Sequence, residues 1–329
     1  MKLPDLTEGH QMTEKIMIAV GGENLIDLVS SKQAEGAPPH YLAMPGGGPF
    51  NVAMAAGRQG LDVTYLTPIS SDAFGDLLAA RLAQSNVAIA AARVHQPTSL
   101  AVVSLDAKGV PSYSFHRNDT AERQVTLEML DDCLPGNTSI FHVGGLALIE
   151  GDDADAWKAL FLQCKQNGIL TSLDPNVRPA LIADRDQYVE RLGQLMKIAD
   201  IVKLSDEDLQ WLYPDRPIER ALADCRADCN ASLFILTLGP DGARGFVGAG
   251  DIHVPSAKTD TIIDTVGAGD TFMAGILRWL VDTDRLTPQA LHATDIESLA
   301  AALTFAAKAA AMNCAQHGCN PPWRDQIDL

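Results

Sequence analysis

The chain has 329 residues, 47% of them hydrophobic, and this length suits one large α/β domain or two small ones with a substantial core. Its formal net charge of −17 at pH 7 argues against nucleic acid or an anionic membrane surface as a partner. A phosphate site in such an acidic chain must be locally positive, built from backbone N–H groups and a few lysine or arginine side chains.

The N-terminal segment and the cysteines exclude two further classes of protein. Residues 1–14 are polar and lack the apolar core of a signal peptide, so we expect a flexible leader, and no apolar run reaches membrane-spanning length. The six cysteines complete no zinc pattern, although the spacing of Cys225 and Cys229 predicts that they share a helix face. We therefore expect reduced thiols in a cytoplasmic protein.

The first predicted strand covers residues 16–20, and residues 23–29 follow with a strand-like apolar pattern that contains the isolated carboxylate of Asp27. A carboxylate can accept two hydrogen bonds from neighbouring hydroxyls, so Asp27 is a candidate for binding a sugar. The alternative is that Asp27 faces solvent on an edge strand. This stretch alone does not decide between the two.

A glycine run at Gly46, Gly47 and Gly48 follows a polar, proline-bearing segment, residues 30–44, that we predict to be a surface excursion. Glycines permit a ligand to approach the backbone closely, and Asn51 at the start of the next helix is expected to cap it or to bind a ligand. The alternative is a flexible joint before a capped helix.

Residues 93–118 contain two alternating segments, 99–105 and 112–116, and predict a β-hairpin. A hairpin that interrupts strand–helix alternation suggests a flap over a site. Arg117 is then a candidate for contact with a substrate, although exposed arginines on hairpins are usually only solvated.

The remaining elements alternate regularly between strands and helices. Residues 169–173 form a strand that leads into Asp174 and Arg178, at the place where open α/β sheets bind their ligands. The sequence therefore predicts one α/β domain over 15–329, with a doubly wound, mostly parallel sheet, helices on both faces, and a small β lid at about 28–45 and 93–121. The other strands in this part are expected at 139–143, 201–204 and 233–238, and the helices at 157–167, 187–198 and 299–314.

The most informative stretch covers residues 264–272, where Gly267, Ala268 and Gly269 precede a helical apolar pattern that starts at Phe272. Small residues at a helix start expose N–H groups at the positive end of the helix dipole, which favours a phosphate. Asp270 lies one residue further on, where a carboxylate can take a proton from an attacking hydroxyl. The alternative is an ordinary helix N-terminus with glycines and an acidic first turn.

Several rival motifs are absent. The sequence has no P-loop pattern, no dinucleotide-binding glycine fingerprint after the first strand, and no nucleophile elbow of an esterase. Phosphoryl transfer to an alcohol remains, because it needs a base and a cradle for the transferred phosphate.

Two separated stretches resemble a known family. Residues 264–270 are similar to the C-terminal signature of the ribokinase-type (PfkB) carbohydrate kinases, and residues 46–53 resemble their N-terminal glycine signature. The similarity covers residues 16–323. Within the family the chain most resembles the bacterial fructokinase branch, on residues 22–27, 174–179, 203–208 and 237–242, while Leu25 stands where ribokinases carry asparagine.

This resemblance implies a ribokinase-like fold and an ATP- and Mg²⁺-dependent kinase that converts fructose to fructose 6-phosphate. It implies that Asp270 is the base and that the backbone of Gly267, Ala268 and Gly269 holds the transferred phosphoryl group. It assigns sugar contacts to Asp27, Gly46, Gly47, Asn51, Arg117 and Arg178, and nucleotide contacts to Ser205, Thr237, Gly239, Gly242, Gly267 and Gly269.

The resemblance also implies two cation sites. The family motif that organises magnesium through water falls on Ser205 and Asp208, both of which depart from it, and Glu207 is a second candidate for the acidic role. Asp264 and Val266 match positions that help to bind a monovalent cation, K⁺, in several relatives.

Other functions remain open at this stage. Arg178 would pair well with a carboxylate, which favours a 2-keto-3-deoxygluconate kinase, and other sugar or nucleoside kinases of the family are further alternatives. A non-catalytic sugar sensor on the same fold would be expected to lack Asp270 or the glycines, and both are intact. A lid with an open sheet edge suggests a homodimer formed through the lid.

Overall fold

The computed structural model describes residues 16–30, 40–105, 111–259 and 261–327, so the predicted leader at 1–14 lies outside the described residues. Within these ranges, none of the helices combines the length and the apolar character needed to cross a membrane.

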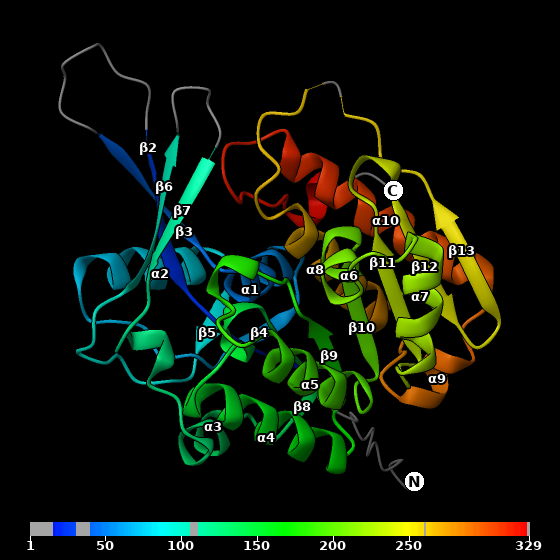
Figure 1. Cartoon of the computed structure of the whole chain (residues 1–329), viewed down its shortest axis with the longest axis horizontal. Helices are drawn as coiled ribbons and strands as arrows, with labels where there is room; N and C mark the ends of the chain where they lie inside the picture. The colour runs from blue at the N-terminus through cyan, green and yellow to red at the C-terminus, as the bar shows by residue number, and fades with distance from the viewer. Residues whose placement is uncertain (1–15, 31–39, 106–110, 260, 328–329) are drawn as a thin grey trace, which may run out of the picture.

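A nine-stranded sheet forms the centre of the molecule, in the order β13-β12-β11-β10-β9-β8-β1-β4-β5 (Figure 1). Strands from β11 to β5 pair in parallel, while β12 and β13 add an antiparallel hairpin at one edge. The α/β prediction with a mostly parallel sheet is therefore confirmed. The strands are β1 Met17–Gly21, β4 Asp62–Tyr65, β5 Val87–Ile89, β8 Thr138–Gly144, β9 Leu170–Asp174, β10 Ile201–Ser205, β11 Leu233–Thr237, β12 Ala243–Val247 and β13 Gly250–Val254.

Helices cover both faces of this sheet, as predicted. Successive side chains of a strand point to opposite faces, and β1 accordingly sends Ile18 and Val20 into one hydrophobic core and Ala19 into the other. Helices α1, α2, α8, α9 and α10 pack on the first core, and α3 to α7 pack on the second. Their bounds are α1 Gly48–Arg58, α2 Ala73–Gln84, α3 Leu127–Cys133, α4 Asp152–Gln166, α5 Arg185–Met196, α6 Asp206–Leu212, α7 Ile218–Ala227, α8 Ala268–Asp282, α9 Pro288–His292 and α10 Ile296–Cys314.

The strand order reverses next to β1. The chain runs from β1 outward to β4 and β5 on one side, then returns to β8 on the other side and continues to β9, β10 and β11. Open α/β sheets bind ligands outside the carboxyl ends of their strands at such a reversal. Here those ends are Gly21 of β1 and Gly144 of β8, so the topology places a ligand site above them.

A second, four-stranded sheet in the order β3-β2-β6-β7, which we call the lid sheet, projects at the upper left of Figure 1. Its outer pairs are antiparallel and its central pair, β2 with β6, is parallel. The expected small β structure beside the main sheet is thus present. Its strands are β2 Leu25–Ser30, β3 Tyr41–Gly46, β6 Ser99–Leu105 and β7 Pro111–His116.

Strand β3 overlaps the lid segment predicted at about 28–45, of which residues 31–39 lie outside the described residues, and Pro45 is tolerated in β3 because this strand lies at a sheet edge. Two local predictions were wrong. Asn51 was expected to cap α1, but the helix begins at Gly48 and its N-cap is Gly47. The earlier start is possible because Pro49 fits the first turn of a helix. Cys229 lies beyond the end of α7 and shares no helix face with Cys225, although all six cysteines are free thiols.

Helices α8 and α10 pack closely at Gly275, so that adding a methyl group at this position should lower the stability of the protein. Gly275→Ala should lower the free energy of unfolding by about 1–3 kcal/mol, because the new Cβ would lie 2.8 Å from Ala306 Cα. Gly193→Ala, within α5, is the matched control: its Cβ meets nothing within 4 Å, so stability should rise by up to about 1 kcal/mol. Urea unfolding measures both, and equal shifts would contradict close packing at Gly275.

Candidate active site

Asp270 lies in the first turn of α8 with 8% of its surface exposed. Asn51, in the first turn of α1, donates a hydrogen bond from Nδ2 to Asp270 Oδ2 at 2.8 Å, so two helix starts meet at this carboxylate. Burial raises the pKa of Asp270 to about 6, against the opposing effect of the Asn51 hydrogen bond. Above that pH the group is a buried carboxylate that can accept a proton.

The backbone before Asp270 has free N–H donors. Gly267 has a φ of 74°, in the left-handed region that favours glycine, and a Cβ there would lie 2.2 Å from Cys319 Sγ. The Ala268 N–H already donates to the carbonyl of Thr265 at 3.2 Å, whereas the N–H groups of Gly269 and Asp270 have no backbone acceptor among the described residues. Free N–H groups at the positive end of a helix dipole favour an anion.

A buried ammonium group lies against the same turn. Lys203, in β10, is 4% exposed, its Nζ is 2.7 Å from Asp174 Oδ2, and a Cβ on Gly269 would lie 3.2 Å from that Nζ. Burial alone would lower the pKa of Lys203, but nearby carboxylates, Asp174 first, outweigh burial and raise it. The side chain therefore stays charged below the glycine turn.

Asp27 and Arg178 face the same region. A Cβ on Gly46 would lie 2.5 Å from Asp27 Oδ2, which shows that the carboxylate rests on the glycine of the paired strand. Burial raises the pKa of Asp27 to about 6, and the Arg178 guanidinium acts against this rise. Arg178 also lowers the pKa of Asp270, although less than Asn51 does, so its charge is felt at both carboxylates.

A small, narrow cavity lies beside Asp174 and Asp270. Two buried oxygens at this place, Asp174 Oδ1 and Asn51 Oδ1, have no hydrogen-bond partner in the described part of the chain. Unpaired buried acceptors cost free energy, and a ligand that carries hydroxyl groups would satisfy them. The lining residues are Gly48, Pro49, Val52, His142, Gly144, Gly145, Asp174, Asn176 and Asp270.

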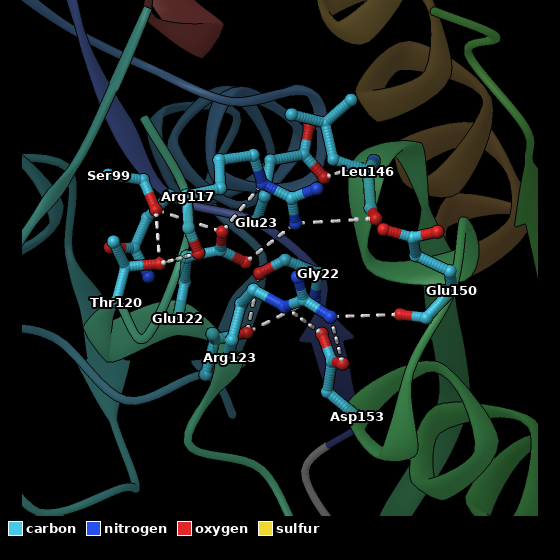
Figure 2. Close-up of polar contacts among 12 residues, drawn as sticks. Gly22, Glu23, Ser99, Arg117, Thr120, Glu122, Arg123, Leu146, Glu150 and Asp153 are labelled. Carbon is cyan, nitrogen blue, oxygen red and sulfur yellow. Dashed lines mark hydrogen bonds and ion pairs between the residues drawn. The ribbon is translucent and has the colours of Figure 1, made fainter. Parts of the chain in front are cut away.

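None of the residues proposed for the sugar belongs to this cavity lining: Asp27, Gly46, Gly47, Asn51, Arg117 and Arg178 all lie outside it. Arg117 is 9% exposed and pairs with Glu122 at 2.8 Å, at the base of the lid sheet (Figure 2). A contact between Arg117 and substrate stays a prediction. Gly47 has a φ of 113°, and a Cβ there would lie 2.5 Å from the Glu23 carbonyl oxygen, so the loop packs on residue 23.

Four of the proposed nucleotide residues, Ser205, Thr237, Gly239 and Gly242, lie at or just after the carboxyl ends of β10 and β11, while Gly267 and Gly269 lie at the start of α8. Ser205 caps α6 and accepts a hydrogen bond from the Asp208 N–H at 3.0 Å, and Thr237 Oγ1 donates to the Leu204 carbonyl at 3.3 Å. A Cβ on Gly239 meets only open space, while one on Gly242 would lie 2.0 Å from the Val254 carbonyl oxygen. Gly239 is therefore open to a ligand, and Gly242 is packed against backbone.

The carboxylate oxygens of two proposed metal residues, Asp208 and Asp264, already accept backbone N–H groups. Asp208 accepts N–H groups of Val177 and Ser205 on its two oxygens, and Glu207 is exposed. Asp264 accepts the N–H groups of Val266 and Gly318, at 3.0 and 2.9 Å. Over the described ranges, no three His, Cys, Asp or Glu side chains are grouped to hold a metal ion. These residues do not fit a Mg²⁺ ion bound directly by the protein, and no reaction step is assigned to one.

Three further residues of this site are not predicted by the sequence motifs: Lys203, His142 and Glu23. Lys203 and His142 stand out as polar residues inside apolar strands, and Glu23 follows the glycines that end β1. His142 Nδ1 lies 2.9 Å from Ser172 Oγ, and burial lowers the pKa of His142 to about 3, so the ring is neutral. A polar residue within a buried strand was the available signal for Lys203 and His142.

The chain belongs to the pfkB family of carbohydrate kinases, which it matches over residues 15–326. It is 35% identical to a fructokinase of Rhizobium leguminosarum bv. trifolii, over 86% of this chain and 85% of that protein. The crystal structure of a fructokinase from Xylella fastidiosa with bound ATP superposes with a TM-score of 0.84 at 27% identity, covering 94% and 96% of the two chains.

A second solved structure is a double mutant of a fructokinase from Vibrio cholerae, with fructose, ADP and a potassium ion bound. It has a TM-score of 0.77 and 27% identity, and the match covers 92% of this chain and 94% of that one. The family and these relatives make the chain an ATP-dependent sugar kinase, as the two signatures predicted.

The raised pKa of Asp270 predicts a pH-dependent gain in stability when its charge is removed. At pH 8 the free energy of unfolding of Asp270→Asn should be about 1–3 kcal/mol higher than that of the parent. The reason is that the parent buries a charged carboxylate above its folded pKa of about 6. The gap should narrow as the pH falls from about 6 and should close near pH 3, below the ordinary aspartate pKa of 3.8, where the carboxyl is protonated in both the folded and the unfolded chain. Urea unfolding at both pH values measures it, and a gap that ignores pH would contradict the account.

Proposed function

We propose that this kinase phosphorylates the terminal hydroxyl of fructose and makes fructose 6-phosphate. The main observation in support is the buried Asp270 carboxylate, which lies beside the free N–H groups of Gly269 and Asp270 and is held by Asn51. The similarity to fructokinases, including the fructose-bound structure from Vibrio cholerae, supports the choice of sugar.

In the proposed reaction, Asp270 accepts the proton of the terminal hydroxyl as the oxygen attacks the γ-phosphorus. The N–H groups at the start of α8, with the charge of Lys203 beneath them, stabilise the negative charge on the transferred group. Asp27, Gly46, Gly47, Asn51 and Arg178 hold the sugar, and closure of the lid sheet excludes water, which would otherwise consume ATP.

ATP binds, in this proposal, over the ends of β10 and β11, near Ser205, Thr237 and Gly239. Mg²⁺ would arrive with the phosphates of ATP, since Mg²⁺ commonly keeps its waters and binds substrate phosphates. A K⁺ site near Asp264 and Val266 is a further part of the proposal, supported by the potassium ion in the Vibrio cholerae structure.

We also propose a cytoplasmic homodimer that forms through the lid sheet. Among the described strands, β3 is an edge strand of this sheet, and its Leu42 and Tyr41 are 61% and 42% exposed. Exposed apolar side chains on an open strand favour pairing with a second subunit.

A 2-keto-3-deoxygluconate kinase is the second candidate, because the exposed Arg178 guanidinium bonds only to backbone carbonyls in the described part of the chain. A guanidinium group can bind a substrate carboxylate in a bidentate manner, with two parallel hydrogen bonds. A coupled assay of ADP release over neutral sugars, sugar acids and nucleosides, with Mg²⁺ and with or without K⁺, separates the candidates. Highest turnover on the acid would replace fructose as the substrate, and no turnover on any of them would favour the sugar sensor.

The base assignment predicts the kinetics of Asp270→Asn. Its kcat should fall by about 10²–10⁴-fold, since general-base catalysis contributes that much, while fructose binding is largely retained. The kcat of the parent enzyme should fall as pH drops through about 6, because protonated Asp270 accepts no further proton. An unchanged kcat in the variant would refute the assignment.

A further inference from the structure

Glu23 is a buried carboxylate, 3% exposed, that the reaction described above does not use. Its Oε1 accepts the N–H of Gly48 at 2.8 Å, and its Oε2 accepts the N–H of Leu146 at 2.9 Å. Gly48 begins α1, and Leu146 belongs to the 3₁₀ turn Gly145–Leu148 that follows β8. One carboxylate therefore joins two segments that come from distant parts of the chain.

Both segments form walls of the cavity at Asp270, through Gly48 and Gly145. A Cβ on Gly145 would lie 2.3 Å from Glu23 Oε2. The Glu23 carboxylate therefore packs directly against Gly145, where a larger residue would not fit. A Cβ on Gly48 would lie 3.5 Å from Glu23 Oε1 and 3.6 Å from Asp270 Oδ1. Gly48 thus lies between the two carboxylates, and a displacement of Glu23 would move the wall that faces the base.

The carbonyl group of Leu146 is connected to the base of the lid sheet by hydrogen bonds (Figure 2). The Leu146 carbonyl accepts a hydrogen bond from Arg117 at 3.4 Å, and Arg117 binds both oxygens of Glu122, at 2.8 and 3.2 Å. Glu122 also accepts the hydroxyl of Ser99 at 2.9 Å. Ser99 begins β6 and Arg117 follows the end of β7, so these contacts run continuously from the base of the lid sheet to the cavity wall.

We propose that Glu23 is a positioning residue for sugar phosphorylation: its two carboxylate oxygens hold the Gly48 and Gly145 walls against Asp270 and tie them to the base of the lid sheet. The proposal rests on the sugar-kinase function. It also gives Arg117 a role in this network instead of a contact with the sugar. The position of Glu23 between two cavity walls carries the proposal. Its burial, which raises the pKa of Glu23 to about 7, is typical of groups at functional sites.

Glu23→Gln tests the proposal, because the amide keeps the shape of the side chain but can accept at only one of its two positions. The control is Asp153→Asn. Asp153 is 5% exposed, and both of its carboxylate oxygens accept hydrogen bonds from Arg123, at 2.9 and 3.1 Å (Figure 2). Neither Asp153 nor Arg123 lines the cavity.

In steady-state kinetics with fructose and ATP, Glu23→Gln should lower kcat/KM for fructose at least about tenfold and leave the KM for ATP within about twofold. Asp153→Asn should leave both within about twofold. A merely structural role of Glu23 would affect the two substrates equally, or would be matched by the control, and either result would overturn the proposal.

A second measurement does not require turnover. Fructose should raise the melting temperature of the parent and of Asp153→Asn, and should raise it less in Glu23→Gln, because weaker binding stabilises less at the same concentration. If Glu23→Gln does not fold, Glu122→Gln should show a smaller shift in the same direction, and a parental response in that variant would count against the network. If the parent itself ignores fructose, the fructose assignment fails, and the sugar with the highest turnover in the panel replaces it in the same comparison.

Discussion

The active site depends on one buried ammonium group, Lys203, and on the carboxylates that keep it charged. Buried charges are costly unless they are paired, and the 2.7 Å contact with Asp174 meets that requirement. The pair forms because β9 and β10 are parallel neighbours, whose carboxyl ends lie at the same edge of the sheet. The positive charge beneath Gly269 lets a chain with a net charge of −17 offer a phosphate a locally favourable place.

The surrounding backbone is held by further carboxylates. Asp208 binds the N–H groups of Val177 and Ser205, and so fixes the loop that carries Arg178 to the start of α6. Glu23 does the same for the starts of α1 and of the turn after β8. Several carboxylates of this site thus orient backbone, and Asp174 Oδ1 is left without a protein partner among the described residues.

The sequence was sufficient to predict the site residues whose contacts lie close together in the chain. It was insufficient to predict the residues whose contacts depend on the order of the strands. The glycines before Asp270 and the glycines before Asn51 are readable because a helix start and its donors lie within a few residues. Lys203 could not be assigned, because its contacts to Asp174 and Gly269 arise only when β9, β10 and α8 come together. Glu23 was missed for the same reason, since its partners Gly48 and Leu146 are 25 and 123 residues away in sequence. The bounds of β3 within the predicted lid segment could not be given, because Pro45 disfavours a strand except at positions such as a sheet edge.

We propose that the chain moves a phosphoryl group from ATP to the terminal hydroxyl of fructose with Asp270 as the base. Phosphorus-31 NMR of a reaction with ATP, Mg²⁺ and fructose tests it directly, because it identifies both products in one sample. We expect one fructose 6-phosphate for each ADP, and neither product with Asp270→Asn over the same time. ADP accompanied by inorganic phosphate, or a phosphate ester at another hydroxyl, would contradict it.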